Sequence, residues 1–179
     1  HGGVDAGATG NQIIEKDLNL ILTRKLEKEL VSRGATVYLT REDDKDLSTT
    51  TVNRKRSDLY NRAKYINKIS PNMYISIHLN SVTNSSWRGL QVFYTTKSEE
   101  NKLIAETITN HLRKNMSNVR EIKKDNTYYM YKHITSPGVL IEAGFISNSN
   151  DSYLLRNKEY QDKLISSISD SIEIYFQKK

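Results

Sequence analysis

The sequence predicts a single α/β domain, with a twisted, mostly parallel sheet that helices flank on both faces. Short apolar segments typical of buried strands alternate with longer segments whose apolar residues recur every three or four positions. Strands separated by helices of this length usually join a parallel sheet through right-handed crossovers. The 179 residues, of which 36% are hydrophobic, suffice for one core. No linker divides them, so one domain is expected over residues 1–179.

Four segments have the periodicity of amphipathic helices. They are residues 15–33, 54–69, 98–114 and about 159–176. Gly34 ends the first helix, and Pro71 lies in the turn that stops the second. The polar residues 41–53 between these two helices are expected to form a surface loop.

Four shorter segments have the β-branched and apolar composition of strands. They are residues 35–40, 73–78, 89–94 and 138–142. His78 and Glu142 are the last residues of the second and fourth of these segments. Ligands of such sheets bind beyond the carboxyl ends of the strands, so chemistry is expected near these two residues.

The overall charge and the absence of cysteine exclude several classes of function. The formal net charge is +6, but Lys and Arg are dispersed, and the cluster Arg54-Lys55-Arg56 is short. It lacks the interleaved aromatic residues of a single-strand binder, so nucleic acid is not an expected partner. Without cysteine there is no disulfide, no thiolate metal site and no cysteine nucleophile. No run approaches the roughly 18 apolar residues of a membrane span.

Four residues are candidates for chemistry, and each has a structural alternative. His1 precedes a glycine-rich turn, although a terminal histidine is often a tag remnant or a frayed end. Glu15 opens the first helix, where an acid also complements the helix dipole. His78 at the end of a strand is either a core residue or a ligand or base. Glu142 lies in an apolar run, where its desolvation requires a compensating metal or catalytic role.

Together these two histidines and two glutamates would complete a hydrolytic zinc site. Three protein ligands leave the fourth position of zinc to water, and a further carboxylate is needed to move the proton. The four residues are dispersed along the chain, unlike a local H-E-x-x-H helix. The site therefore depends on the fold to assemble it.

Several blocks of sequence, in order along the chain, resemble one known family. They are His1 to Ala8 with Glu15 following, Thr40-Arg41 with Asp44, Leu59 with Arg62-Ala63, Ser76 to Ser81, and Pro137 to Asn148. These blocks are similar to the motifs of zinc-dependent N-acetylmuramoyl-L-alanine amidases, the type called amidase family three. The resemblance extends from residue 1 to residue 148.

The resemblance implies the roles of the four residues. His1, Glu15 and His78 match the ligands of one zinc ion, and Glu142 matches the catalytic glutamate. The implied reaction is hydrolysis of the amide between N-acetylmuramic acid and L-alanine in peptidoglycan, and the implied fold is again a mostly parallel sheet flanked by helices.

The short single-domain form looks most like the germination-specific amidases of spore-forming bacteria. This likeness implies a role in spore cortex modification, as the first step toward muramic lactam. It also implies an accessory activator protein or lipoprotein as partner. The expected location is extracytoplasmic, in the cell wall or the intermembrane space of the forespore.

The sequence departs from the family pattern in two places. Family members usually have a strand ending in Asp-Pro-Gly just before the first histidine, and this strand is absent here. We therefore expect either an upstream strand and targeting segment outside the recorded chain or a weakened affinity for zinc. Some cell-division amidases also carry an autoinhibitory insertion where Thr95-Thr96 runs almost directly into the next helix, so this form of self-inhibition is not expected.

Further residues are candidates for binding the substrate. They are Asn80, Arg41, Arg62, Lys132 and His133. His111 lies among polar residues of a predicted helix and is expected at the surface. Two alternatives to the amidase remain: a zinc carboxypeptidase that uses Arg41 or Arg62 to clamp a terminal carboxylate, and a non-catalytic cell-wall-binding module.

Overall fold

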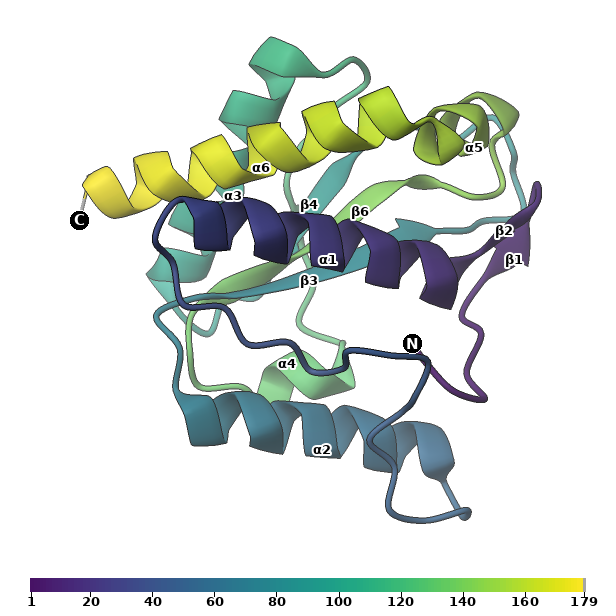
Figure 1. The fold of residues 1–179 in the computed structure, drawn as a ribbon, viewed down its shortest axis with the longest axis vertical. Coiled ribbons are helices and arrows are strands. Elements are labelled where there is room, and N and C mark those ends of the chain that lie inside the picture. Colours follow the sequence, from purple (N-terminus) through teal and green to yellow (C-terminus); the bar gives the residue numbers. More distant parts are fainter. Residues whose placement is uncertain (179) are drawn as a thin grey trace.

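Helices cover both faces of a four-stranded sheet in the computed structural model, which describes residues 1–178 (Figure 1). The strands lie in the order β3, β6, β4, β5, and a separate two-stranded hairpin is formed by β1 and β2. Their bounds are β1 Thr9–Gly10, β2 Ile13–Ile14, β3 Tyr74–Asn80, β4 Gln91–Tyr94, β5 Lys123–Lys124 and β6 Gly138–Phe145. β3 is parallel to β6 and β5 is parallel to β4, whereas β4 is antiparallel to β6, so the sheet is mixed.

The helices form one layer on each face of the sheet (Figure 1). One layer contains α1 Glu15–Ser32, α3 Glu99–Asn115, α5 Ser149–Arg156 and α6 Lys158–Gln177, and the other contains α2 Arg54–Ile69 and α4 Tyr129–His133. Alternate residues of β6 belong to different cores: Val139 and Ile141 lie in the core of the first layer, and Leu140 in that of the second. The predicted α/β class with helices on both faces is confirmed.

The four predicted helices all form, with ends within about one residue of those expected. The third helix begins after Ser98, whose side chain accepts a hydrogen bond from the Glu100 amide at 3.1 Å and so caps the helix. Only residues 95–98 separate β4 from this helix, in agreement with the expected absence of an inserted helix at this point. No helix within residues 1–178 is long and apolar enough to cross a membrane.

The prediction of a strand over residues 35–40 is wrong. The segment belongs to no strand, half of its residues are exposed and the other half are partly buried, and Tyr38 has 60% of its surface accessible. Strand propensity reflects packing against neighbouring strands, and within residues 1–178 none pairs with this segment. Its β-rich composition therefore predicted a ladder that these residues do not form.

Several short elements were not predicted from the sequence. They are the hairpin β1–β2, the strand β5, and the helices α4 and α5. Each is shorter than the window of 11 or more residues, roughly three helical turns, over which apolar periodicity can be recognised. Local capping still explains one of them: the side chain of Asn148 accepts a hydrogen bond from the Asp151 amide at 3.0 Å, which starts α5.

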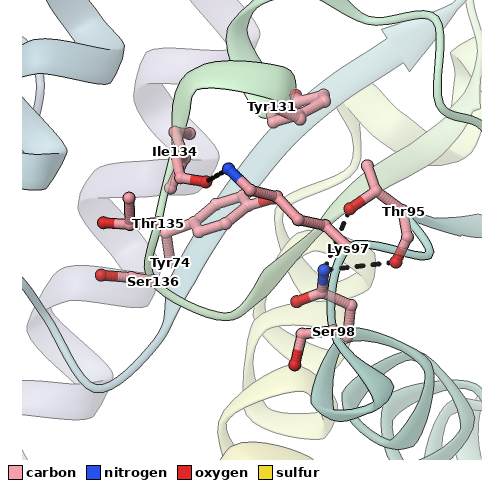
Figure 2. Close-up of a pocket in the computed structure, with 9 residues that line it drawn as sticks. Tyr74, Thr95, Lys97, Ser98, Tyr131, Ile134, Thr135 and Ser136 are labelled. Carbon is pink, nitrogen blue, oxygen red and sulfur yellow. Dashed lines mark hydrogen bonds between the residues drawn. The ribbon is translucent and has the colours of Figure 1, made fainter.

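The short helix α4 is anchored by a lysine from the β4–α3 connection. The Nζ of Lys97 donates hydrogen bonds to the carbonyl oxygens of Lys132 and Ile134, at the end of α4. Lys97 lines a cavity together with Tyr74 and Tyr131 (Figure 2), and the volume of this cavity is about 190 Å³. The cavity lies at the amino-terminal ends of β3 and β6, away from His78 and Glu142.

The pairing of β3 with β6 leaves no room for a side chain at residue 138. In this parallel register Tyr74 lies beside Gly138 and His78 beside Glu142. A Cβ atom at residue 138 would be 2.2 Å from the carbonyl oxygen of Tyr74. Glycine at this position therefore permits the close approach that brings His78 and Glu142 together.

We expect Gly138→Ala to destabilise the fold by about 3 kcal/mol, because the added methyl group meets backbone atoms that cannot move aside. Urea unfolding monitored by circular dichroism would measure this loss. Gly10→Ala is a suitable control, since its nearest neighbour is a side-chain methyl group of Ile146 at 3.2 Å. Equal stability of the two variants would show that β3 and β6 can separate without cost.

Candidate metal centre

Contacts with two carboxylates hold the ring of His1 in place. Its Nδ1 lies 3.1 Å from Oδ2 of Asp5, and the other oxygen of Asp5 accepts a hydrogen bond from the Gly7 amide at 3.0 Å. This contact leaves Nε2 of His1 directed at Glu15, 3.3 Å away. A carboxylate behind an imidazole fixes the ring orientation and the tautomer, which suits the ring for a metal.

Glu15, the first residue of α1, lies at the centre of the site and is 4% exposed. Its Oε2 accepts a hydrogen bond from the Ala8 amide at 2.8 Å, and its Oε1 is 3.0 Å from Nδ1 of His78. Gly7 makes this close packing possible, because a Cβ there would be 2.5 Å from Oε2 of Glu15. Gly7 also has a positive φ of 67°, which favours glycine.

This packing shifts the pKa values of Glu15 and His1. Burial alone would raise the pKa of Glu15, but hydrogen bonds with His1, His78 and the Ala8 amide hold that pKa well below its usual range. Burial alone would lower the pKa of His1, but hydrogen bonds with Glu15 and Asp5 raise it above its ordinary value. Glu15 is therefore an anion over the physiological pH range.

His78 completes a group of three metal-type donors. Its ring and that of His1 meet edge to face, with centroids 5.2 Å apart and planes at 85°. One donor atom from each of His1, Glu15 and His78 lies within 4.8 Å of the others. Two imidazole nitrogens and one carboxylate oxygen form a donor set that fits zinc and leaves a coordination position for water.

Glu142 lies next to this group on the adjacent strand. It pairs with His78 in the sheet register and is 7% exposed. Its Oε2 is buried and has no hydrogen-bond partner within residues 1–178. Burial, and then the negative charge of Glu15, raise the pKa of Glu142 to about 8, while the charge of His1 opposes the shift.

Two of the expected substrate-binding residues are engaged in internal contacts. Arg41 is buried and donates hydrogen bonds to the carbonyl oxygens of Asp43 and Lys16. Arg62 is buried in an ion pair with Asp58, with Nε and Oδ2 2.8 Å apart. Arg62 also donates a hydrogen bond to Oγ1 of Thr40 at 2.9 Å. The Arg41 and Arg62 contacts thus tie the loop of residues 33–53 to α1 and α2 and favour a structural role for both arginines.

Of the other three residues expected to bind substrate, one lies close to His78 and two lie on α4. Asn80 ends β3, two residues after His78, at an irregularity in the sheet register. Lys132 and His133 are exposed at the end of α4, where the ring of His133 contacts those of Tyr60 and Tyr129. No contact joins either of these two side chains to the donor group within residues 1–178. His111 is bonded to Asn115 on α3 and lies apart from the site.

Two tyrosines near Glu142 were not among the residues predicted from the sequence. Burial, followed by the charges of Glu142, Asp125 and Glu15, raises the pKa of Tyr128 to about 12. Tyr131 is buried, and its pKa is also raised, by burial first and with a contribution from Glu142. Both come from the Tyr-rich stretch around α4, whose five residues gave no helical periodicity to place them.

Comparisons with known proteins agree with this geometry. The family model described as N-acetylmuramoyl-L-alanine amidase matches residues 1–174. A germination-specific N-acetylmuramoyl-L-alanine amidase of Bacillus subtilis (strain 168) is 41% identical over 184 residues, covering 100% of this chain and 78% of the relative.

Two solved structures have the same fold along the whole chain. The CwlD amidase from Clostridioides difficile, solved in complex with the GerS lipoprotein, has a TM-score of 0.94 and 36% identity, covering 100% of this chain and 95% of that one. The catalytic domain of CwlV, an amidase from Bacillus (Paenibacillus) polymyxa var. colistinus, has a TM-score of 0.86 and 28% identity, with coverage of 100% and 95%. The chain therefore belongs to the N-acetylmuramoyl-L-alanine amidases, which hydrolyse the bond between N-acetylmuramic acid and L-alanine in the bacterial cell wall.

Proposed function

We propose that this amidase is a zinc enzyme in which His1, Glu15 and His78 bind one zinc ion and Glu142 is the catalytic glutamate. The observation that carries the proposal is the convergence of three donor atoms within 4.8 Å, from residues far apart in the sequence. The chemistry of the donors supports zinc, because neutral imidazole and carboxylate are ligands that zinc prefers. The buried, unpartnered Oε2 of Glu142 supports a reactive role for that carboxylate.

The roles of the residues follow from their surroundings. When bound, zinc supplies Lewis acidity, which makes water more acidic and polarises the substrate carbonyl. Asp5 orients His1 through Nδ1, and Glu15 stays ionised among its hydrogen bonds. Glu142 takes a proton from the attacking water and returns it to the departing amine of L-alanine. A carboxyl group whose pKa is raised toward neutrality is suited to both transfers.

The alternatives have less support. A carboxypeptidase needs an arginine for the terminal carboxylate, whereas the guanidinium groups of Arg41 and Arg62 are engaged in internal contacts. A non-catalytic wall-binding module has no need for four convergent hydrolytic residues, all of which are present here. The family to which the chain belongs also favours the amidase over both.

We further propose that the enzyme acts on spore cortex peptidoglycan outside the cytoplasm, as the first step toward muramic lactam. The support is the likeness to a germination-specific amidase over the whole chain. We also propose an accessory lipoprotein as partner, because a similar amidase has been solved in complex with one. Comparing turnover of cortex with that of vegetative peptidoglycan tests the substrate part of this proposal.

We expect the protein to bind one zinc ion per chain and His78→Ala to lose it. Loss of a residue that only hydrogen-bonds to a metal ligand lowers metal affinity roughly 10- to 100-fold. Loss of the ligand His78 itself should lower zinc affinity by a larger factor. Metal content after dialysis, measured by mass spectrometry, checks this. His111→Ala is the control, because this histidine is bonded to Asn115 away from the site. Full zinc content in His78→Ala would contradict the ligand assignment.

We expect Glu142→Gln to keep its zinc and to lose turnover by about 10²- to 10⁴-fold, because glutamine cannot accept the proton. The assay is the release of new L-alanine amino termini from cortex and from vegetative peptidoglycan. Normal turnover of this variant would exclude the proposed role of Glu142. Release of D-alanine by the unmodified enzyme would indicate the carboxypeptidase instead.

We expect the metal-free protein to lose stability as the pH rises, through Glu142. Its folded-state pKa of about 8 lies above the ordinary value of 4.5, so the folded form keeps a proton that the unfolded form releases. This contribution is fully present below pH 4.5 and is lost as the pH rises through 8. The stability of Glu142→Gln relative to the unmodified protein should therefore increase between pH 5 and about pH 8.5. Urea unfolding with a chelator present measures it, and a constant difference would mean that Glu142 is ionised throughout.

A further inference from the structure

A basic cleft lies between the first turns of α2 and the helix α4. Its volume is about 550 Å³, and its lining residues are Asn53, Arg54, Lys55, Arg56, Leu59 and Tyr129. We call this set the α2 cleft. It contains the Arg54-Lys55-Arg56 cluster, which has no role in the proposed catalysis.

The α2 cleft lies on the same side of the sheet as the catalytic residues. Leu140 of β6 packs against α2 and α4 in the second core, and Glu142, two residues further along the strand, points to the same face. Tyr74 of β3 belongs to the same core, so His78, four residues further along, also points to this face. Substrate in the site can therefore extend toward the α2 cleft.

Direct contacts connect the α2 cleft to the metal centre. Lys55 from the cleft lies 3.5 Å from Oδ2 of Asp5, and the same oxygen is 3.1 Å from Nδ1 of His1. One carboxylate thus separates a lining residue of the cleft from a donor of the candidate metal site. The α2 cleft therefore adjoins the metal centre.

The three cations of the α2 cleft differ in their pairing. Arg54 is paired with Asp46 at 2.8 Å, and Lys55 is paired with Asp5. Arg56 is exposed, makes no ion pair within residues 1–178, and has its guanidinium carbon 5.0 Å from the centre of the Tyr129 ring. The tyrosine restricts the orientation of the guanidinium group while leaving its donors available. The α2 cleft therefore offers one unpaired, oriented arginine to an anion.

We propose that the α2 cleft binds a carboxylate of the peptide half of the substrate and that Arg56 is the residue that recognises it. The inference rests on the proposed function of the His1, Glu15 and His78 site. The glycan half presents hydroxyl and acetamido groups, whereas the stem peptide beyond L-alanine carries free carboxylates. A guanidinium group matches a carboxylate with two parallel hydrogen bonds, so charge assigns the peptide half to the α2 cleft. The glycan then extends to the opposite side of the metal centre.

The first test uses the unmodified, zinc-loaded enzyme with two soluble muramoyl-peptides. One has free peptide carboxylates, and in the other these groups are converted to amides. We expect the amidated substrate to have a KM about tenfold higher with kcat nearly unchanged, the scale of one charge-assisted hydrogen bond. Equal KM values for the two substrates would overturn the proposal.

The second test assigns the effect to Arg56. Arg56→Gln should raise KM about tenfold for the free-carboxylate substrate and leave that of the amidated substrate unchanged. Tyr129→Leu should change KM in the same direction by a smaller factor, because it removes only the orienting ring. Lys64→Gln is the matched control, since this exposed lysine lies about two turns further along the same helix. The proposal would also be overturned if Arg56→Gln raised KM equally for both substrates, or if Lys64→Gln raised KM as much as Arg56→Gln does.

These tests separate the inference from the function on which it rests. If Arg56→Gln behaves like the unmodified enzyme while Glu142→Gln is inactive, the α2 cleft is not the peptide site and the catalytic proposal stands. Zinc content and melting temperature of the Arg56 and Tyr129 variants identify any loss caused by misfolding. In that event the comparison of the two substrates with the unmodified enzyme decides, because it needs no variant.

Discussion

The carboxylate of Glu15 is the group on which the arrangement of the site depends. One of its oxygens accepts the Ala8 amide, and the other lies within 3.3 Å of both imidazole rings and of the Leu79 amide. It therefore joins the N-terminal turn, the start of α1 and the end of β3 at a single point. A buried anion with this many donors is stable, whereas the same carboxylate without them would be costly. The position of each histidine follows from that of Glu15.

The two glutamates of the site have opposite surroundings, and this difference gives them different chemistry. Glu15 is surrounded by donors that lower its pKa, whereas Glu142 lies in the apolar strand β6 without a partner for Oε2, and its pKa is raised. Two neighbouring carboxyl groups whose pKa values are moved apart commonly divide the roles of permanent anion and proton carrier. The apolar run around Glu142 is thus part of the chemistry as well as of the core.

The sequence predicted what depends on local pattern and chemistry. The helical stripes located α1, α2, α3 and α6, and Gly34 and Pro71 marked the ends of the first two. His78 and Glu142 became candidates because they end predicted strands. What it could not predict depends on contacts between distant residues. Residues 35–40 have strand composition but no neighbouring strand. The charge of Glu142 acts on the pKa of Tyr128 only because α4 packs against the sheet. Arg41 and Arg62 look available in the sequence, yet buried contacts engage them.

His1 illustrates how a surface loop determines the geometry of a buried site. Asp44, from the loop of residues 33–53, accepts hydrogen bonds from the Gly3 amide at 2.8 Å and from Lys16 at 2.6 Å. Lys16 in turn donates to the Gly3 carbonyl at 2.9 Å. The backbone packs so closely that a Cβ on Gly2 would be 2.2 Å from the carbonyl oxygen of Lys45. The loop therefore restrains the glycine-rich turn, and through that turn it helps to set the direction of the His1 ring.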